Sequence, residues 1–174
     1  MDKFIEIQKQ DLIVSGTAET ASGDSDLKDT GVFADVSVGD IVHQTSDDEF
    51  FTVSNKIDND NVELTALDGG TIPVVAAKTF KVYSATSAKS VLVSSSDVKL
   101  VEQVSGSTST VTIGYDNQAS GNDVLTITHL PVAAGSEEMR DKVQSHISKS
   151  LQTAWNEVVY SDSLPKKVVD IAFS

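Results

Sequence analysis

Cysteine is absent from this chain of 174 residues, which excludes disulfides and thiolate metal sites. Aromatic residues make up only 6% of the chain, too few for the stacking surface of a carbohydrate-binding module. No apolar run approaches the length that crosses a bilayer, and no signal peptide is visible at the N-terminus. We therefore expect no membrane partner and a protein that is made and used without secretion.

Positive charge is also scarce. The 13 Lys and Arg residues stand against 26 Asp and Glu residues, which gives a formal net charge of −13. Because nucleic acid is recognised by a basic surface, we expect no nucleic-acid partner. Acidity of this kind keeps a protein dispersed through mutual repulsion, and this is the interpretation that we favour. A partner with a basic surface is the alternative.

The common catalytic and cofactor motifs are missing. The nucleophile elbow G-x-S-x-G, the dinucleotide motif G-x-G-x-x-G and the phosphate loop G-x-x-x-x-G-K do not occur. The histidines His43, His129 and His146 lack metal-ligand spacing, and we interpret them as structural or surface residues. We expect no enzymatic activity and no cofactor, and we name no catalytic, cofactor-binding or metal-ligating residue.

Two acidic segments are candidates for a cation site. One contains Asp24, Asp26 and Asp29, and the other contains Asp58 and Asp60. A calcium loop needs a defined frame of ligands that ends in a bidentate acid, and neither segment has one. Asp and Asn also bond their own backbone in turns. We therefore interpret both segments as solvated turns, and cation binding there stays open.

The C-terminal part of the chain predicts a sheet with one packed helix. Four apolar residues share a spacing of four positions and fall on one helix face. They are Met139, Val143, Ile147 and Leu151. Ser136 is the expected N-cap. Alternation of apolar and polar residues with a period of two indicates a sheet with one buried face. We expect strands at Val98–Val104, Thr110–Tyr115, Asp123–Leu130 and Val168–Phe173, and a helix at Glu137–Asn156.

Trp155 continues the apolar stripe of the expected helix. Its burial against the sheet would make Trp155→Ala the most damaging substitution in this part of the chain, at roughly 3–5 kcal/mol.

The segment Ser105-Gly106-Ser107 is interpreted as a flexible hairpin between two strands, since no lysine follows it as in a phosphate loop.

The preceding region predicts a small all-β unit. Turn signals such as Gly39-Asp40 and Asp68-Gly69-Gly70 recur at close intervals, which is typical of a meander or an SH3-like barrel. We expect strands at Asp40–Gln44, Glu49–Asn55, Asn61–Ala66 and Phe80–Tyr83, with a weaker one at Ile72–Val75.

The expected fold is mainly β with one long α-helix: a small β-barrel-like N-terminal unit and a C-terminal α+β unit. The strand Phe4–Ile7 has no obvious partner in the barrel. We hypothesise that it pairs in the C-terminal sheet, which would make the barrel an insertion in a discontinuous domain. The expected divisions are an N-terminal strand at 1–14, a polar arm or loop at 15–31, the barrel-like domain at 32–85, a linker at 86–96 and the α+β domain at 97–174.

Two series of segments resemble virion structural proteins of tailed bacteriophages, especially phages of marine bacteria. The first series is "SSSDVKLVEQ", "TSTVTIGY", "DVLTITHL" and "EEMRDKVQSHISKSLQTAWNEVVY", preceded near the N-terminus by "KFIEI". The second is "VGDIVHQTSDDEFFTVSNKIDNDNVELTA", which is similar to the small β-modules of phage head and tail proteins. The resemblance covers most of the chain apart from residues 15–30.

The resemblance implies a non-enzymatic protein that binds an assembled virion in many copies. Capsid decoration (cement) proteins are acidic, β-rich and of this size, and they stabilise the head by binding the lattice of the major capsid protein. They are often trimers, so the resemblance favours a homo-oligomer, most simply a trimer, made in the host cytoplasm and placed on the capsid surface of the virion. A tail, neck or baseplate component is the alternative. Two competing interpretations come from other functional classes: a receptor- or carbohydrate-binding module, and a small acidic hydrolase.

Overall fold

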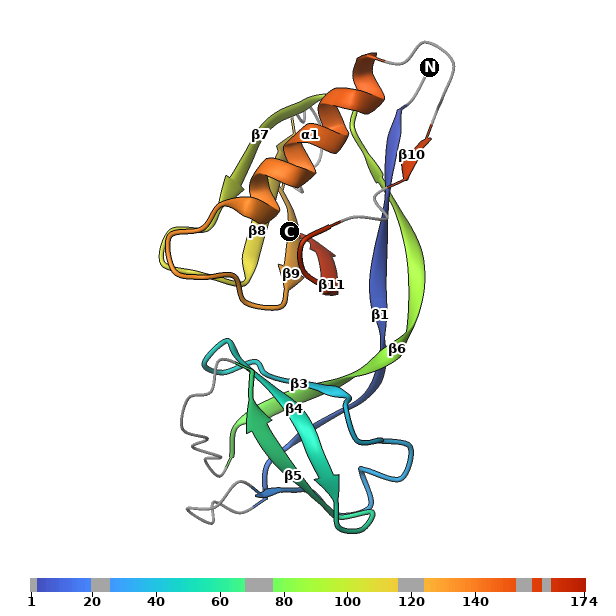
Figure 1. Ribbon diagram of the computed structural model, residues 1–174, viewed down its shortest axis with the longest axis vertical. Helices are drawn as coiled ribbons and strands as arrows, with labels where there is room; N and C mark the ends of the chain where they lie inside the picture. Colours follow the sequence, from blue (N-terminus) through green and yellow to red (C-terminus); the bar gives the residue numbers. More distant parts are fainter. Residues whose placement is uncertain (1–2, 20–25, 68–76, 116–123, 153–157, 161–163) are drawn as a thin grey trace. The chain divides into compact units, whose positions relative to one another are not determined.

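The computed structural model describes residues 3–19, 26–67, 77–115, 124–152, 158–160 and 164–174, and these residues are mainly β-strand with a single helix. The chain divides into two units (Figure 1). Unit 1 consists of Met1–Lys9 and Ala88–Ser174, and unit 2 consists of Gln10–Ser87. Two long strands, β1 (Phe4–Thr17) and β6 (Thr79–Ser94), contribute to both units.

The sheet of unit 1 is built from strands at both ends of the chain. Its remaining elements are β7 (Val98–Gln103), β8 (Thr110–Tyr115), β9 (Val124–His129), α1 (Glu138–Gln152), β10 (Val158–Tyr160) and β11 (Val168–Phe173). Hydrogen-bonded neighbours follow the order β6-β1-β11-β9-β8-β7, and β10 also pairs with β1. The pairs of β1 with β10 and β11 are parallel, with Ile5 opposite Val159 and Lys9 opposite Val168. The segment Phe4–Ile7 therefore lies in the sheet formed by the C-terminal residues, and unit 2 is inserted into unit 1.

The alternation in β8 and β9 puts their apolar residues on one face of the sheet. Val111, Ile113, Leu125 and Ile127 are fully buried. The threonines between them, at positions 110, 112, 126 and 128, are half-buried on the opposite face. The buried face packs against α1, since Met139, Val143 and Ile147 belong to the same core. This confirms the prediction of a sheet with one buried face and a helix on it.

The helix begins as expected but turns its apolar stripe away from the core near its end. Ser136 Oγ accepts a hydrogen bond from the Glu138 backbone N–H at 3.4 Å, as an N-cap does. Leu151, however, is 54% exposed, and the position that faces the core is Ser150, which is fully buried. A spacing of four residues drifts by about 40° per step on a helix, so three steps from Met139 move Leu151 by about 120°. Trp155 and Asn156 lie outside the described residues.

Unit 2 is an antiparallel sheet. It adds β2 (Asp26–Lys28), β3 (Ile41–Gln44), β4 (Glu49–Lys56) and β5 (Asn61–Ala66) to β1 and β6, in the order β2-β5-β4-β3-β6-β1. Its core contains Phe33, Phe51, Val62, Phe80 and Val82, among other residues. The barrel-like architecture is not confirmed, because among the described strands the hydrogen-bonded order has two ends and the sheet does not close. The expected strand Ile72–Val75 lies outside the described residues.

The expected polar arm at 15–31 contains strand structure. β1 continues to Thr17, and β2 pairs with β5, with Leu27 opposite Val62. Leu27 is only 2% exposed, and the Glu19 backbone N–H donates to the Lys28 carbonyl at 2.9 Å. The buried Leu27 thus anchors β2 within a segment whose composition is that of a loop.

The expected linker at 86–96 is also strand, because β6 continues to Ser94. Residues 86–90 are exposed, but β6 pairs with β1 here: Gln8 Nε2 donates to Ser90 Oγ at 2.7 Å, and Ser87 Oγ donates to Asp11. The division between the units falls inside these two paired strands, after Lys9 and after Ser87, and no linker separates them.

Among the described helices, none is long and apolar enough to span a membrane.

Candidate functional site

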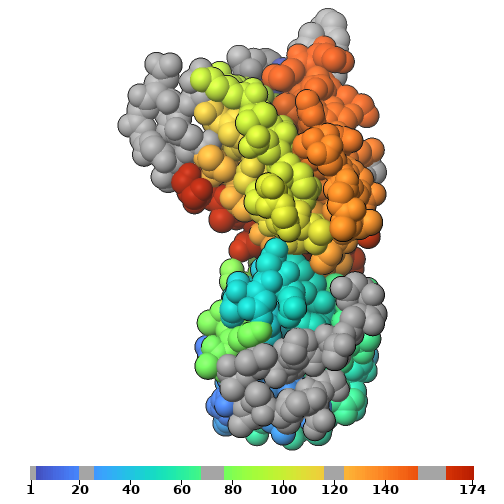
Figure 2. All heavy atoms as spheres, turned by 90° about the vertical axis from the view of Figure 1, so that its left-hand side faces the viewer, coloured from blue at the N-terminus to red at the C-terminus, as the bar shows by residue number. Residues whose placement is uncertain are grey.

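Unit 1 contains a pocket of about 270 Å³ at the end of the β7–β8 hairpin. We call it the hairpin pocket. One wall is formed by residues 103–108, which end β7 and turn toward β8, and the other by residues 133–137, which lead into α1. Figure 2 shows the hairpin and α1 side by side on one face of unit 1, in agreement with the packing of α1 on β7.

Backbone hydrogen bonds hold the two walls together. The hairpin closes through the Ser107 N–H, which donates to the Val104 carbonyl at 3.0 Å. The Val132 N–H donates to the Thr108 carbonyl at 2.9 Å and so ties the second wall to the first. Gly135 has a φ of +78°, which a residue with a side chain rarely adopts. The shape of the two walls is therefore fixed by these backbone hydrogen bonds and by the positive φ that glycine allows at position 135.

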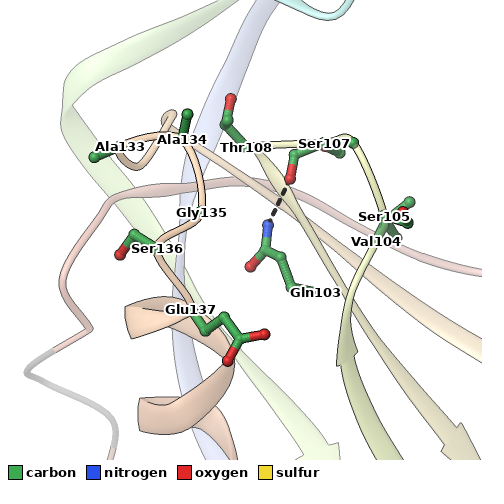
Figure 3. A pocket seen from close by; sticks show the side chains of 11 residues that line it. Gln103, Val104, Ser105, Ser107, Thr108, Ala133, Ala134, Gly135, Ser136 and Glu137 are labelled. Atoms are coloured by element: carbon green, nitrogen blue, oxygen red, sulfur yellow. Dashed lines mark hydrogen bonds between the residues drawn. The ribbon is translucent and has the colours of Figure 1, made fainter.

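The lining of the pocket includes the side-chain acceptors of Gln103 and Glu137. Gln103 Nε2 donates to the Ser107 carbonyl at 3.0 Å, and this fixes the orientation of the side-chain amide. Gln103 Oε1 is buried and has no hydrogen-bond partner among the described residues. Figure 3 shows the Gln103 side chain directed into the space between the two walls, with Glu137 on the helix side. No Lys, Arg or His is among the lining residues.

Arg140 lies beside the pocket on the first turns of α1. Its guanidinium is 2.6 Å from Glu137 Oε2 and 2.6 Å from Asp141 Oδ1. The hydrogen bonds that Arg140 donates to the Asp141 carboxylate, followed by the charges of Asp141 and Glu137, raise the pKa of Arg140 above its ordinary value. Arg140 therefore stays cationic and holds one oxygen of Glu137, which leaves the other carboxylate oxygen available.

Each histidine has a local environment of its own. His43 Nε2 is 3.0 Å from Asp48 Oδ1, and its ring stacks on Phe50 at 4.2 Å. His129 is fully buried, with Nδ1 2.8 Å from the Leu130 carbonyl. His146 is buried on α1. His43 belongs to unit 2 and the other two to unit 1.

The acidic turns use their carboxylates to hold backbone. Asp58 Oδ1 accepts from the Asp60 N–H at 2.7 Å and from Asn61 Nδ2 at 2.8 Å. These bonds lower the pKa of Asp58, the Asp60 backbone bond most. Asp60 Oδ1 accepts from the Gly31 N–H at 2.6 Å. Within the part of the chain that the structure describes, no group of three or more His, Asp or Glu residues is placed to hold a metal ion.

The hairpin pocket is a feature that the sequence analysis did not find. The Ser105-Gly106-Ser107 hairpin was visible as a turn, and it forms one wall. The second wall follows much later in the chain, and no local pattern links the two. No protein-family model, curated protein or solved structure matches this chain. Function is therefore inferred from the residues themselves.

Proposed function

We propose that this protein is a non-enzymatic structural protein of a tailed-bacteriophage virion. More specifically, we propose a capsid decoration (cement) protein that binds the lattice of the major capsid protein and stabilises the head. The proposal starts from the resemblance of the strand and helix series to phage virion proteins. The observation that carries it is the edge of unit 1 formed by β7.

β7 is the last strand in the hydrogen-bonded order of the described residues. An edge strand offers backbone donors and acceptors to a strand of another chain. A bulge between Val98 and Leu100 interrupts pairing at one end, which is a common protection against aggregation. The other end runs through Leu100, which is 50% exposed, to Val104, which is 37% exposed, at the hairpin pocket. This end supports docking onto a partner.

A decoration protein gains affinity from repetition. When one copy contacts neighbouring subunits of a lattice, the second contact is effectively intramolecular, so weak interfaces combine into stable binding. A strand edge beside a small pocket is an interface of this weak, repeatable kind. A tail, neck or baseplate component would use the same edge, and its position in the virion separates it from a decoration protein.

Binding to capsids tests the proposal directly. Purified protein is mixed with capsids that lack decoration, and bound protein and capsid melting temperature are measured. We expect saturable binding with a higher capsid melting temperature. Leu100→Glu should weaken binding by about tenfold or more, because it places a charge at the centre of the docking edge.

The matched control is Leu12→Glu, since Leu12 is 51% exposed on the unit 2 part of β1. This variant should bind like the unmodified protein. Absence of saturable binding, together with an unchanged capsid melting temperature, would reject the decoration function. If cryo-electron microscopy places the chain in the tail, the proposed virion structural role stands and the proposed location on the capsid is wrong.

A further inference from the structure

We propose that the hairpin pocket binds the ammonium or guanidinium group of a lysine or arginine side chain from a partner protein. That this partner is a capsid protein rests on the proposed function, whereas the preference for a cationic side chain rests on the pocket alone. The pocket residues are those at 103–108 and 133–137.

The first support is the unsatisfied acceptor. Buried polar atoms in folded proteins nearly always have a hydrogen-bond partner, and Gln103 Oε1 has none among the described residues. Gln103 cannot rotate to solve this, because its Nε2 is already bonded to the Ser107 carbonyl at 3.0 Å. A carbonyl oxygen needs a donor, and lysine and arginine side chains carry only donors.

The second support is charge. Glu137 lines the pocket, and its side chain is 52% exposed. Arg140 engages its Oε2, which leaves Oε1 for a second cation. The other polar lining side chains are serine and threonine hydroxyls, which can accept from a cation as well as donate. The pocket therefore offers one anionic oxygen of Glu137 and the hydroxyl oxygens of Ser105 and Thr108 to a donor, and the Gln103 amide oxygen lies buried in its wall.

Size restricts the ligand. A volume of about 270 Å³ is below the range of about 300–1,000 Å³ that is usual for drug-sized ligands and cofactors. It suits the end of one long side chain. No aromatic residue lines the pocket, so a sugar ring would find no stacking surface there. A single basic side chain fits both constraints.

The N-terminus of α1 would favour an anionic ligand, but its contribution to ligand preference is small here. A helix N-terminus favours an anion through its free amides. The Glu138 amide is already capped by Ser136 Oγ, and Glu137, Glu138 and Asp141 place negative charge on the same turn. An anion would therefore meet carboxylates, and the neighbouring Arg140 is already paired with Glu137 and Asp141.

Nuclear magnetic resonance titration with small probes tests the pocket without any virion component. The probes are Nα-acetyl-lysine methylamide and Nα-acetyl-arginine methylamide, compared with uncharged Nα-acetyl-methionine methylamide and with sodium phosphate at equal ionic strength. We expect saturable shifts of the backbone amides of residues 103–108 and 133–137 with the cationic probes, with a Kd on the order of millimolar. Added salt should weaken the binding.

Two neighbouring glutamates supply matched variants. Glu137→Gln should weaken binding of the cationic probes about tenfold, because it removes the charged acceptor. Glu138→Gln makes the same change one residue away, outside the pocket lining, and should leave the affinity within about twofold. Equal shifts with the uncharged probe, a preference for phosphate, or an unchanged affinity in Glu137→Gln would overturn the proposal.

The capsid and probe experiments fail independently. If the probes bind as expected and capsids do not bind, the pocket chemistry stands and the decoration function falls. If capsids bind and the cationic probes do not, the decoration function stands and the pocket proposal falls. If both hold, Glu137→Gln should also weaken capsid binding while Glu138→Gln does not.

Discussion

The two units of this protein differ most in their charge. Unit 2 contains fourteen acidic and four basic residues, a formal net charge of −10, whereas unit 1 contains twelve acidic and nine basic residues, a net charge of −3. The acidity of the chain is thus concentrated in the inserted segment. Since unit 1 carries the docking edge and the hairpin pocket, the less acidic unit is the one with a specific candidate surface.

The difference extends to how each unit is stabilised. Unit 1 places a helix on one face of its sheet and uses basic residues for ion pairs, such as Lys9 with Asp170 at 2.8 Å. Among the described residues unit 2 has strands and turns only, and many of its acids hold backbone in those turns. The two hydrophobic cores share no residue. We therefore expect the units to respond separately to substitution, even though β1 and β6 run through both.

Phe51→Ala should produce the largest effect and tests this independence. Phe51 is 3% exposed in the core of unit 2, and its truncation should cost about 3–5 kcal/mol. Far-ultraviolet circular dichroism should then show an early transition for unit 2. The sole tryptophan, Trp155, belongs to unit 1, so its fluorescence transition should keep its midpoint. A parallel shift of both signals would show that the units unfold as one.

Met139→Ala is the corresponding change in unit 1. Met139 is fully buried where α1 meets the sheet, and we expect a loss of about 2–5 kcal/mol in the free energy of unfolding. Trp155 fluorescence during urea denaturation measures it. Glu138→Ala alters the adjacent exposed residue and should change stability by at most about 1 kcal/mol. Equal losses in the two variants would mean that α1 is not anchored through this residue.

A repeating sequence pattern predicts the structure correctly where it determines burial. Alternation in Thr110–Tyr115 and in the strand that ends at His129 predicted one buried face, and both strands have it. The short strand at Phe4–Ile7 lacked a partner nearby in the chain, and β1 pairs with β10 and β11. Spacing also identified α1, but a strict step of four residues placed Leu151 in the core, where Ser150 lies.

Composition is a poor guide where single contacts decide the structure. Residues 15–31 and 86–96 are small and polar, yet Leu27 anchors β2 in the first segment and pairing with β1 keeps the second one extended. The hairpin pocket depends on the Val132 N–H and the Thr108 carbonyl, which local patterns do not relate. Long-range contacts of this kind are decided by tertiary packing and leave no periodic pattern in either segment.

Tyr115→Phe should have a moderate effect, confined to unit 1. Tyr115 donates to the Ser94 carbonyl at 2.9 Å, and losing this bond should cost about 0.5–1.5 kcal/mol near neutral pH. Burial raises the pKa of Tyr115 to about 12, from an ordinary value of 10.0. The folded state thus keeps the proton longer than the unfolded state does. The stabilisation is complete below pH 10 and is lost as the pH rises toward 12.

The measurement for Tyr115 is urea denaturation at several alkaline pH values. The free energy of unfolding of the unmodified protein should fall between about pH 10 and pH 12, and the decline should be smaller in Tyr115→Phe. Parallel curves for the two proteins would contradict the assignment of the raised pKa to Tyr115.

Asp58→Asn should produce the smallest effect, and it tests the acidic turns of unit 2. Hydrogen bonds from the Asp60 N–H and from Asn61 lower the pKa of Asp58 below its ordinary value of 3.8. The ionised carboxylate therefore adds stability above pH 3.8, and this is lost as the pH falls through the lowered pKa. Stability measured against acid pH should decline less steeply in the variant. Asp35→Asn is the control, since it relieves the same negative charge at another exposed carboxylate of unit 2. If both variants reduce the loss of stability at acid pH equally, general charge repulsion in unit 2, and not the Asp58 turn, governs the response of this unit to acid.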